Sequence, residues 1–351
     1  MNKLKPSRLV VGIKLLQIFF WNEAKVFAVG GETCSRSYLS HTKMNCAMQN
    51  DSQVIEEINK IIPPLTYSQH KGQAGRIGIV GGSEEYTGAP YFAALSALKV
   101  GADLAHVFCP SAASPVIKSY SPELIVHPLL DKEDGLTAIK DWLPRLGSVV
   151  IGPGLGRLSS TMQTVKDIIA ELKELSTPIV IDADGLFLVT QDPDVILGYK
   201  RAILTPNVVE FRRLANAMNI EARNDDPVQE TIDLSKALGD VTIVRKGKVD
   251  IIAHGDQVLK VTEDGSPRRC GGQGDLLSGS MATFAFWAYK NETKVTANPG
   301  AVAAYGACML TKKCASLAFV KYGRSTTTTD LIAEIHTVFE GTFEIFSNKN
   351  L

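Results

Sequence analysis

Short runs of β-branched residues alternate with longer helical patterns between about residue 52 and residue 345. The runs occupy residues 77–80, 149–151, 179–181, 202–204 and 243–244, and two antiparallel strands are expected near 249–253 and 256–261. Helical patterns cover residues 90–99, 275–290, 296–316 and 329–340. This alternation is typical of βα units around a largely parallel sheet. Because no repeat or linker interrupts residues 52–345, we predict a single α/β domain there.

The amino-terminal segment differs in composition from the rest of the chain. Residues 1–50 hold seven of the 37 Lys and Arg residues but only two of the 37 Asp and Glu residues. An apolar run from Leu9 to Trp21 is interrupted by Lys14, so it is too short and too broken to span a membrane. We predict a targeting leader or disordered extension over residues 1–51, with a mitochondrial address favoured over a weak secretory signal, and a short tail over residues 346–351. Initiation near Met48 would give a cytoplasmic form.

The remainder of the chain, after residue 50, carries a formal charge of −5. A mildly acidic domain argues against nonspecific binding to nucleic acid. The six cysteines lack C-x-x-C spacing, which favours neither a zinc site nor a disulfide framework. We therefore expect small-molecule partners, no nucleic acid and no membrane, and leave open whether the protein forms a homo-oligomer.

Polar and glycine-rich motifs follow directly after the predicted strands. They are GGSEEYTGAP (81–90), GPGLG (152–156), DADGL (182–186), TPNVVEF (205–211) and RKGKVD (245–250). In a parallel sheet the carboxyl ends of the strands share one edge, where α/β proteins bind ligands. The motifs are therefore expected to meet in one cleft.

The segment RRCGGQGDLLSG (268–279) predicts an anion site. Its glycines allow backbone amides to turn toward a ligand, and the helix that follows adds unpaired amides and a positive dipole end. Arg268 and Arg269 would form charged walls. Asp275 would repel a phosphate, but its presence is explained if it takes a proton from a hydroxyl that attacks a phosphoryl group. A flexible turn with a helix-capping Asp275 is the alternative.

Several motifs allow more than one interpretation. GPGLG is not a dinucleotide fingerprint, because Arg157 occupies the place of the third glycine, and no Walker-A P-loop is present. Asp182 and Asp184 hold a ligand or cap a helix, and capping is favoured. Asn207 and Glu210 share one helix face and either bind Mg²⁺ beside phosphates or form a capping box.

Taken together, these motifs closely resemble the family of ATP- or ADP-dependent NAD(P)H-hydrate dehydratases, which are relatives of ribokinase-like kinases. The likeness covers about residues 52–345 and rests on the ordered set of segments 70–104, 152–157, 182–186, 204–214, 246–250 and 268–279. The RRCGGQGD version is similar to the eukaryotic, ATP-using branch. The resemblance implies a ribokinase-like three-layer α/β sandwich with a central, mostly parallel sheet.

The resemblance also implies a function and a set of site residues. The expected reaction is ATP-dependent dehydration of hydrated NADH or NADPH, with Asp275 catalytic and facing the substrate hydroxyl. The implied contacts of the hydrated dinucleotide are Gly154, Gly156, Asn207, Val208, Val209, Glu210, Phe211, Arg212, Arg213 and Asp275. The implied contacts of ATP are Lys246, Gly247, Lys248, Val249, Asp250, Gly265, Ser266, Pro267, Arg268, Arg269, Cys270, Gly271, Gly272, Gln273 and Gly274. Mg²⁺ is the expected cofactor, with Glu210 as its candidate ligand.

Two other functions remain open at this point. A conventional kinase of the same fold, acting on a vitamin-precursor alcohol, would release a stable phosphorylated product. A catalytically silent nucleotide-binding protein would turn over no ATP with the hydrated cofactor.

Overall fold

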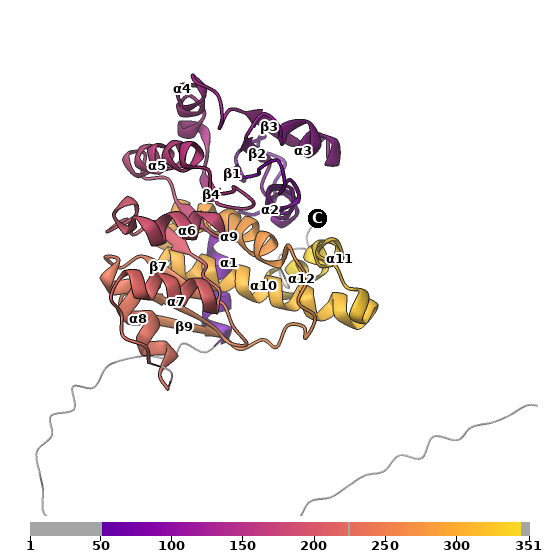
Figure 1. Cartoon of the computed structure of the whole chain (residues 1–351). Coiled ribbons are helices and arrows are strands. Elements are labelled where there is room, and N and C mark those ends of the chain that lie inside the picture. The colour runs from indigo at the N-terminus through magenta and orange to yellow at the C-terminus, as the bar shows by residue number, and fades with distance from the viewer. Residues whose placement is uncertain (1–50, 224, 345–351) are drawn as a thin grey trace, which may run out of the picture. The chain divides into compact units, whose positions relative to one another are not determined.

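The computed structural model describes residues 51–223 and 225–344, which form a sheet covered by helices on both faces (Figure 1). The predicted leader, apart from Asp51, and the predicted tail lie outside these residues. Asp51 opens the first helix, where its carboxylate accepts a hydrogen bond of 2.8 Å from the Tyr305 hydroxyl.

The sheet has nine strands in the order β3-β2-β1-β4-β5-β6-β7-β8-β9. Strands β1 to β7 pair in parallel, whereas β8 is antiparallel to both β7 and β9. Their bounds are β1 (Arg76–Val80), β2 (Leu104–Cys109), β3 (Leu124–Pro128), β4 (Ser148–Ile151), β5 (Ile179–Ile181), β6 (Ala202–Leu204), β7 (Thr242–Arg245), β8 (Asp250–His254) and β9 (Gln257–Val261). The central strands are buried on both sides, which explains their continuous apolar character.

Two hydrophobic clusters separate the sheet from its two helical layers. One layer contains α1 (Asp51–Ile61), α2 (Gly88–Val100), α3 (Ser114–Tyr120), α9 (Gln273–Lys290), α10 (Pro299–Tyr322), α11 (Thr328–Ala333) and α12 (Ile335–Phe343). The other contains α4 (Gly135–Lys140), α5 (Ser159–Glu174), α6 (Asp184–Gln191), α7 (Val208–Ala217) and α8 (Pro227–Ala237). Short 3₁₀ turns occupy Leu143–Arg145, Pro193–Val195, Glu292–Lys294 and Gly323–Ser325. The predicted three-layer sandwich is confirmed.

The predicted strands and helices are all present, but β2 and β3 escaped prediction. Each of these strands contains a histidine, His106 or His127, that interrupts the apolar pattern. Both imidazole rings pack against Trp142, and His106 Nδ1 lies 3.0 Å from His127 Nε2. The tertiary fold therefore buries His106 and half-buries His127, which a hydrophobicity pattern reads as polar. The helix predicted at 329–340 is divided into α11 and α12 at Glu334.

The strand order places a topological switch point between β1 and β4. The loops that follow these two strands touch, because the Gly82 amide donates a hydrogen bond of 2.9 Å to the Pro153 carbonyl. A Cβ atom at Gly81 would lie only 2.3 Å from that same oxygen, so this close approach requires glycine. The prediction that the motifs after β1 and β4 lie together is confirmed.

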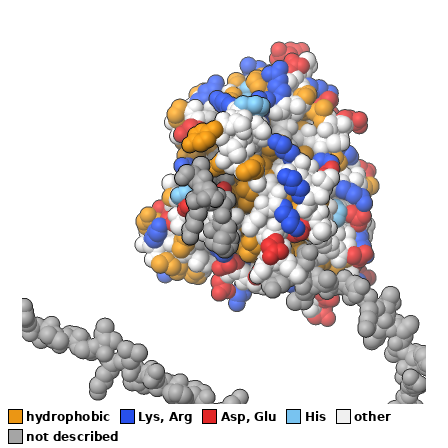
Figure 2. All heavy atoms as spheres, turned by 180° about the vertical axis from the view of Figure 1, so that it is seen from behind, with side chains coloured by type: hydrophobic (Ala, Val, Ile, Leu, Met, Phe, Trp, Pro, Cys, Tyr) orange, Lys and Arg blue, Asp and Glu red, His pale blue; other side chains and the backbone are white. Residues whose placement is uncertain are grey.

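On the face seen in Figure 2, basic and acidic side chains both occur across the surface, and hydrophobic side chains lie in separated patches. Among the described helices, none is both long enough and apolar enough to cross a bilayer.

Candidate active site

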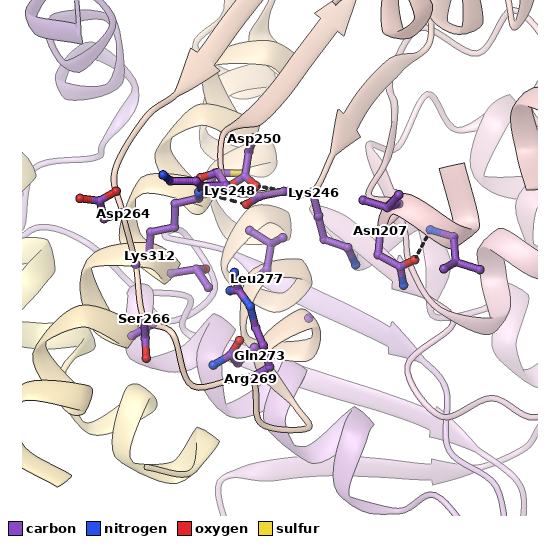
Figure 3. A pocket seen from close by; sticks show the side chains of 18 residues that line it. Asn207, Lys246, Lys248, Asp250, Asp264, Ser266, Arg269, Gln273, Leu277 and Lys312 are labelled. Atoms are coloured by element: carbon purple, nitrogen blue, oxygen red, sulfur yellow. Dashed lines mark hydrogen bonds and ion pairs between the residues drawn. The ribbon is translucent and has the colours of Figure 1, made fainter. Parts of the chain in front are cut away.

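A cavity of about 480 Å³ lies where the loop after β7, the beginning of α9 and helix α10 meet (Figure 3). We call it the first cavity. Its lining residues are Asn207, Val208, Val209, Lys246, Gly247, Lys248, Asp250, Asp264, Gly265, Ser266, Arg269, Gln273, Gly274, Leu277, Cys308, Thr311, Lys312 and Ala315. The volume falls in the range of small-molecule binding sites.

The amino end of α9 forms one wall of this cavity. Gly272 precedes the helix with φ of +90°, a conformation that favours glycine, and its carbonyl accepts the Leu276 amide at 3.0 Å. The amides of Gln273, Gly274 and Asp275 belong to the first turn and have no acceptor inside the helix. Arg269 adds a cationic side chain to the same wall. This arrangement suits the terminal phosphates of a nucleotide.

Asp275 follows Gly274 on α9. Within the part of the chain that the structure describes, its carboxyl group has no hydrogen bond or ion pair. Burial, together with the smaller effect of the Asp182 charge, raises the pKa of Asp275 to about 7, and the charge of Lys246 opposes both effects. An unpartnered carboxyl group with a pKa near neutrality is suited to accept and release a proton at physiological pH.

Lys246 lies between the carboxylates of Asp182 and Glu210 at this edge of the sheet, and it also interacts electrostatically with Asp275. Its Nζ lies 2.9 Å from Asp182 Oδ1 and 4.0 Å from Glu210 Oε2. Burial lowers the pKa of Lys246, but the carboxylates of Asp182 and Glu210 outweigh burial, so the net shift is upward and the group stays charged. Asp182 also lies against α9, since a Cβ atom at Gly274 would be 3.2 Å from Asp182 Oδ2.

The favoured capping role of Asp182 and Asp184 is wrong. Helix α6 has Ala183 as its N-cap and no side-chain cap. Asp182 pairs with Lys246 instead, while Asp184 accepts hydrogen bonds from the Gly156 amide at 3.0 Å and from Arg157 Nε at 2.9 Å. The sheet brings these partners to the two aspartates from distant parts of the chain. A local sequence pattern does not reveal such contacts.

The turn between β7 and β8 is held by Asp250. Its carboxylate accepts the Gly247 amide at 2.8 Å and lies 3.6 Å from Lys312 Nζ. Lys312, on α10, also donates to the carbonyls of Gly247 and Lys248. Sequence reasoning missed Lys312, because it lies in a helical pattern with no motif around it.

Nine of the residues predicted to bind ATP line the first cavity. They are Lys246, Gly247, Lys248, Asp250, Gly265, Ser266, Arg269, Gln273 and Gly274. The other six, Val249, Pro267, Arg268, Cys270, Gly271 and Gly272, do not line it. Thr328 on α11 holds the back of the loop by donating to the Gly271 carbonyl and contacting Cys270 Sγ. Arg268 turns toward the Thr326 carbonyl, so only Arg269 forms the predicted charged wall.

Residues 207–213, which are predicted to contact the substrate, cap and begin helix α7. Their side chains therefore point in different directions. Asn207 Oδ1 accepts the amides of Val209 and Glu210, and Glu210 Oε2 accepts the Asn207 amide at 2.8 Å, which is a complete capping box. Asn207, Val208 and Val209 line the first cavity.

Phe211 and Arg212 were predicted to contact the hydrated dinucleotide, but they line neither cavity. Phe211 is fully buried with the Arg245 guanidinium 4.3 Å above its ring, and Arg212 is paired with the buried Glu230. The 3.6-residue period of α7 turns these positions away from the cavity edge.

A second cavity of about 560 Å³ lies between α6 and α7. It is lined by Arg157, Ala183, Asp184, Leu186, Phe187, Thr190, Gln191, Glu210, Arg213 and Asn216. Glu210 connects the two cavities, because it lines the second and approaches Lys246 of the first. Gly154 and Gly156 have positive φ angles and line neither cavity, and the Gly156 amide donates a hydrogen bond to Asp184.

Among residues 51–223 and 225–344, no group of three or more His, Cys, Asp or Glu side chains is arranged to hold a metal ion. A divalent cation beside a nucleotide can take phosphate oxygens as ligands in addition to protein groups. Mg²⁺ commonly binds in this way, with one or two carboxylates and phosphate oxygens. Glu210 is a carboxylate at the edge of the first cavity, so it fits that role. Its Oε2 atom accepts the Asn207 amide of the capping box.

Comparison with known proteins gives one consistent result. The family model described as NAD(P)H-hydrate dehydratase matches residues 77–337. An ATP-dependent (S)-NAD(P)H-hydrate dehydratase of Ciona intestinalis is 60% identical over 299 residues, covering 84% of this chain and 83% of that protein. The Homo sapiens protein of the same name is 54% identical over 300 residues, covering 85% of this chain and 86% of its own length.

Solved structures agree with the fold. An Enterococcus faecalis ribokinase-like protein superposes with a TM-score of 0.69 at 20% identity, over 82% of this chain and 94% of its own. The ADP/ATP-dependent NAD(P)H-hydrate dehydratase of Bacillus subtilis, co-crystallized with ATP/Mg²⁺, gives 0.60 at 21% identity, over 85% of this chain and 99% of its own. With the family model and the closely similar full-length relatives in agreement, the chain belongs to the NAD(P)H-hydrate dehydratase family.

Proposed function

We propose that the protein catalyses the ATP-dependent dehydration of hydrated NADH and NADPH, restoring the reduced cofactor. Membership of the family supports this activity. The observation that carries it is Asp275, an acid without a side-chain partner among the described residues, with a pKa raised to about 7, on the helix whose amino end lines the first cavity.

In this proposal the first cavity binds ATP. The amides of the first α9 turn and the side chains of Arg269 and Lys246 neutralise the terminal phosphate. Asp275 accepts the proton of the ring hydroxyl while the hydroxyl oxygen attacks the γ-phosphorus, and the bond to ADP breaks. Phosphate is then a good leaving group, so the lone pair of the ring nitrogen expels it. Loss of a proton from the adjacent ring carbon restores the dihydronicotinamide.

We further propose that the reaction uses Mg²⁺ and that Glu210 is the protein group closest to it. A bound Mg²⁺ would supply charge neutralisation for the phosphates. Lys246 then serves as the second cation at the same edge, held in place by Asp182.

One assay tests the function. The full-length protein is incubated with hydrated NADH or NADPH, ATP and Mg²⁺, while reduced-nicotinamide absorbance, ADP and free phosphate are followed. We expect all three to rise together in equal amounts. A stable phosphorylated product without recovery of absorbance would indicate a conventional kinase, and absence of ATP turnover would indicate a silent nucleotide-binding protein.

For the leader we propose a mitochondrial address. The basic residues before Glu23 and the absence of acids among them support it. Imaging the full-length protein beside a form starting at Met48 tests this; equal distribution of the two forms would contradict it.

A further inference from the structure

The loop before α9 is fastened from behind by helix α11. The Thr328 hydroxyl donates a hydrogen bond of 2.5 Å to the Gly271 carbonyl and lies 3.6 Å from Cys270 Sγ. Thr328 is 2% exposed, so this hydrogen bond is shielded from water. A buried threonine that follows Gly271 by 57 residues therefore holds the backbone of the loop that leads into α9.

The next residue of the loop, Gly272, is enclosed between Thr328 and Phe92. A Cβ atom at Gly272 would lie 2.9 Å from Thr328 Oγ1 and 2.9 Å from Phe92 Cδ2. Gly272 is the N-cap of α9, and its carbonyl accepts the Leu276 amide. The residue that holds the Gly271 carbonyl therefore also limits where the first turn of α9 can begin.

The hydrogen bond to Gly271 determines the direction of the following amide. The Gly271–Gly272 peptide bond is trans, so its carbonyl oxygen and its N–H group point in opposite directions. Because the carbonyl points to α11, the Gly272 amide points away from α11. This amide has no acceptor among the described residues. It therefore adds to the free amides of the first turn of α9.

We propose that Thr328 is a positioning residue for phosphoryl transfer and acts through the Gly271–Gly272 peptide. Thr328 itself does not line the first cavity. The inference rests on the proposed function, which brings the terminal phosphates of ATP to the amino end of α9. Amides that are oriented in advance stabilise the charge that develops on a transferring phosphoryl group. Loss of the Thr328 hydroxyl should therefore slow the chemical step more than it weakens nucleotide binding.

The kinetic test compares wild type with Thr328→Val, Thr328→Ala and Thr328→Ser, using ATP and hydrated NADH. Valine keeps the shape of threonine without its hydroxyl group, whereas serine keeps the hydroxyl group. We expect Thr328→Val to lower kcat roughly ten- to a hundredfold and to change KM for either substrate by less than about threefold. Thr328→Ser should recover most of kcat. Thr328→Ala carries the same test if Thr328→Val does not fold.

A binding measurement separates positioning of the loop from general loosening of the site. ADP with aluminium fluoride and Mg²⁺ mimics the transferring phosphoryl group, whereas ADP alone does not. We expect Thr328→Val to weaken binding of the aluminium fluoride complex roughly tenfold and to change the Kd of ADP by less than about twofold. General loosening would weaken binding of both ligands equally, and that result would overturn the proposal.

Ser148→Ala is the matched control. Ser148 is fully buried at the start of β4, and its hydroxyl donates a hydrogen bond of 2.6 Å to the Ala282 carbonyl. Its removal should leave kcat unchanged. Wild-type kcat and aluminium fluoride affinity in Thr328→Val, or an equal loss of kcat in Ser148→Ala, would overturn the Thr328 assignment alone. A wild type that does not restore the hydrated cofactor would overturn the proposed function, while the titrations with ADP and aluminium fluoride would still test Thr328.

Discussion

Asp275 and Asp182 are acids with different environments at one edge of the sheet. Asp182 is ion-paired with Lys246, whereas Asp275 has no partner among the described residues and is desolvated. Burial and the neighbouring charge of Asp182 both favour the protonated form of Asp275, and Lys246 only partly offsets them. Asp182 is therefore suited to hold Lys246, and Asp275 is suited to accept a proton. This difference comes from their environments, since both residues are aspartates.

Asp275→Asn should remove the proton acceptor. We expect kcat for the hydrated cofactor to fall by about 10²–10⁴-fold, the usual effect of removing a positioned base, while ATP affinity persists. Stopped assays of ADP release and a separate nucleotide titration measure these quantities. Asp240→Asn is the control, because Asp240 lies on the surface before β7 at positive φ, which Asn tolerates. Near-normal turnover of Asp275→Asn would contradict the assignment.

The pH dependence of kcat/KM should reveal the titration of Asp275. The base must be deprotonated, so activity should rise with pH through an acidic limb near pH 7. Asp182→Asn removes a charge that raises the pKa of Asp275 and leaves Lys246, which lowers it. Glu210 remains beside Lys246. The acidic limb should therefore move to lower pH, and a limb that stays in place or moves upward would refute the coupling.

At the scale of helices, α2 and α9 approach so closely that only glycine fits at their contact. A Cβ atom at Gly279 would lie 2.0 Å from the Ala93 carbonyl oxygen. The same contact holds α9, whose first residues Gln273 and Gly274 line the first cavity and are followed by Asp275. Helix packing in one layer thus determines the geometry of the site at the sheet edge.

Gly279→Ala should destabilise the protein by about 1–3 kcal/mol, because the added methyl group overpacks a buried contact. Urea unfolding followed by circular dichroism measures the change. Gly341→Ala on α12 is the matched control, since among the described residues no atom beyond its own stretch of helix lies within 4 Å of its added Cβ. There alanine should be neutral or slightly stabilising within a helix. Equal free energies of unfolding for the two variants would contradict this prediction, because α2 and α9 would then move apart at no cost.

For the whole molecule, the buried carboxylate of Glu230 on α8 links α7 and β7. It pairs with Arg212 Nη1 at 2.5 Å and with Arg245 Nη1 at 2.8 Å. Arg212 precedes Arg213 of the second cavity, and Arg245 precedes Lys246 of the first. This ion triad, built around a buried carboxylate, therefore orients the walls of both cavities.

Glu230→Gln should destabilise the fold by about 3 kcal/mol or more, because two arginine charges lose their buried counter-ion. Denaturant titration measures the loss, and KM for both ATP and the hydrated cofactor should rise as the walls loosen. Asp256→Asn breaks the exposed ion pair with Lys236 and should cost less than about 1 kcal/mol. Similar losses of unfolding free energy for Glu230→Gln and Asp256→Asn would contradict a stabilising role of the ion triad.

The sequence alone determined the α/β class, the order of most strands and the motifs that meet at one sheet edge. Local periodicity and turn chemistry encode these features. The same local rules gave the Asn207–Glu210 capping box as one of two alternatives, and the structure forms it. The sequence also pointed to Lys246, Arg269 and Gly274, which line the first cavity.

Only the tertiary structure decided the remaining roles. It buried Phe211 and paired Arg212 with Glu230 and Asp182 with Lys246. It also brought Lys312 to the β7–β8 turn and opened the second cavity between α6 and α7. The physical reason is distance along the chain: Asp182 and Lys246 are 64 residues apart. Contacts of that kind are set by strand order and helix packing, which no local pattern contains.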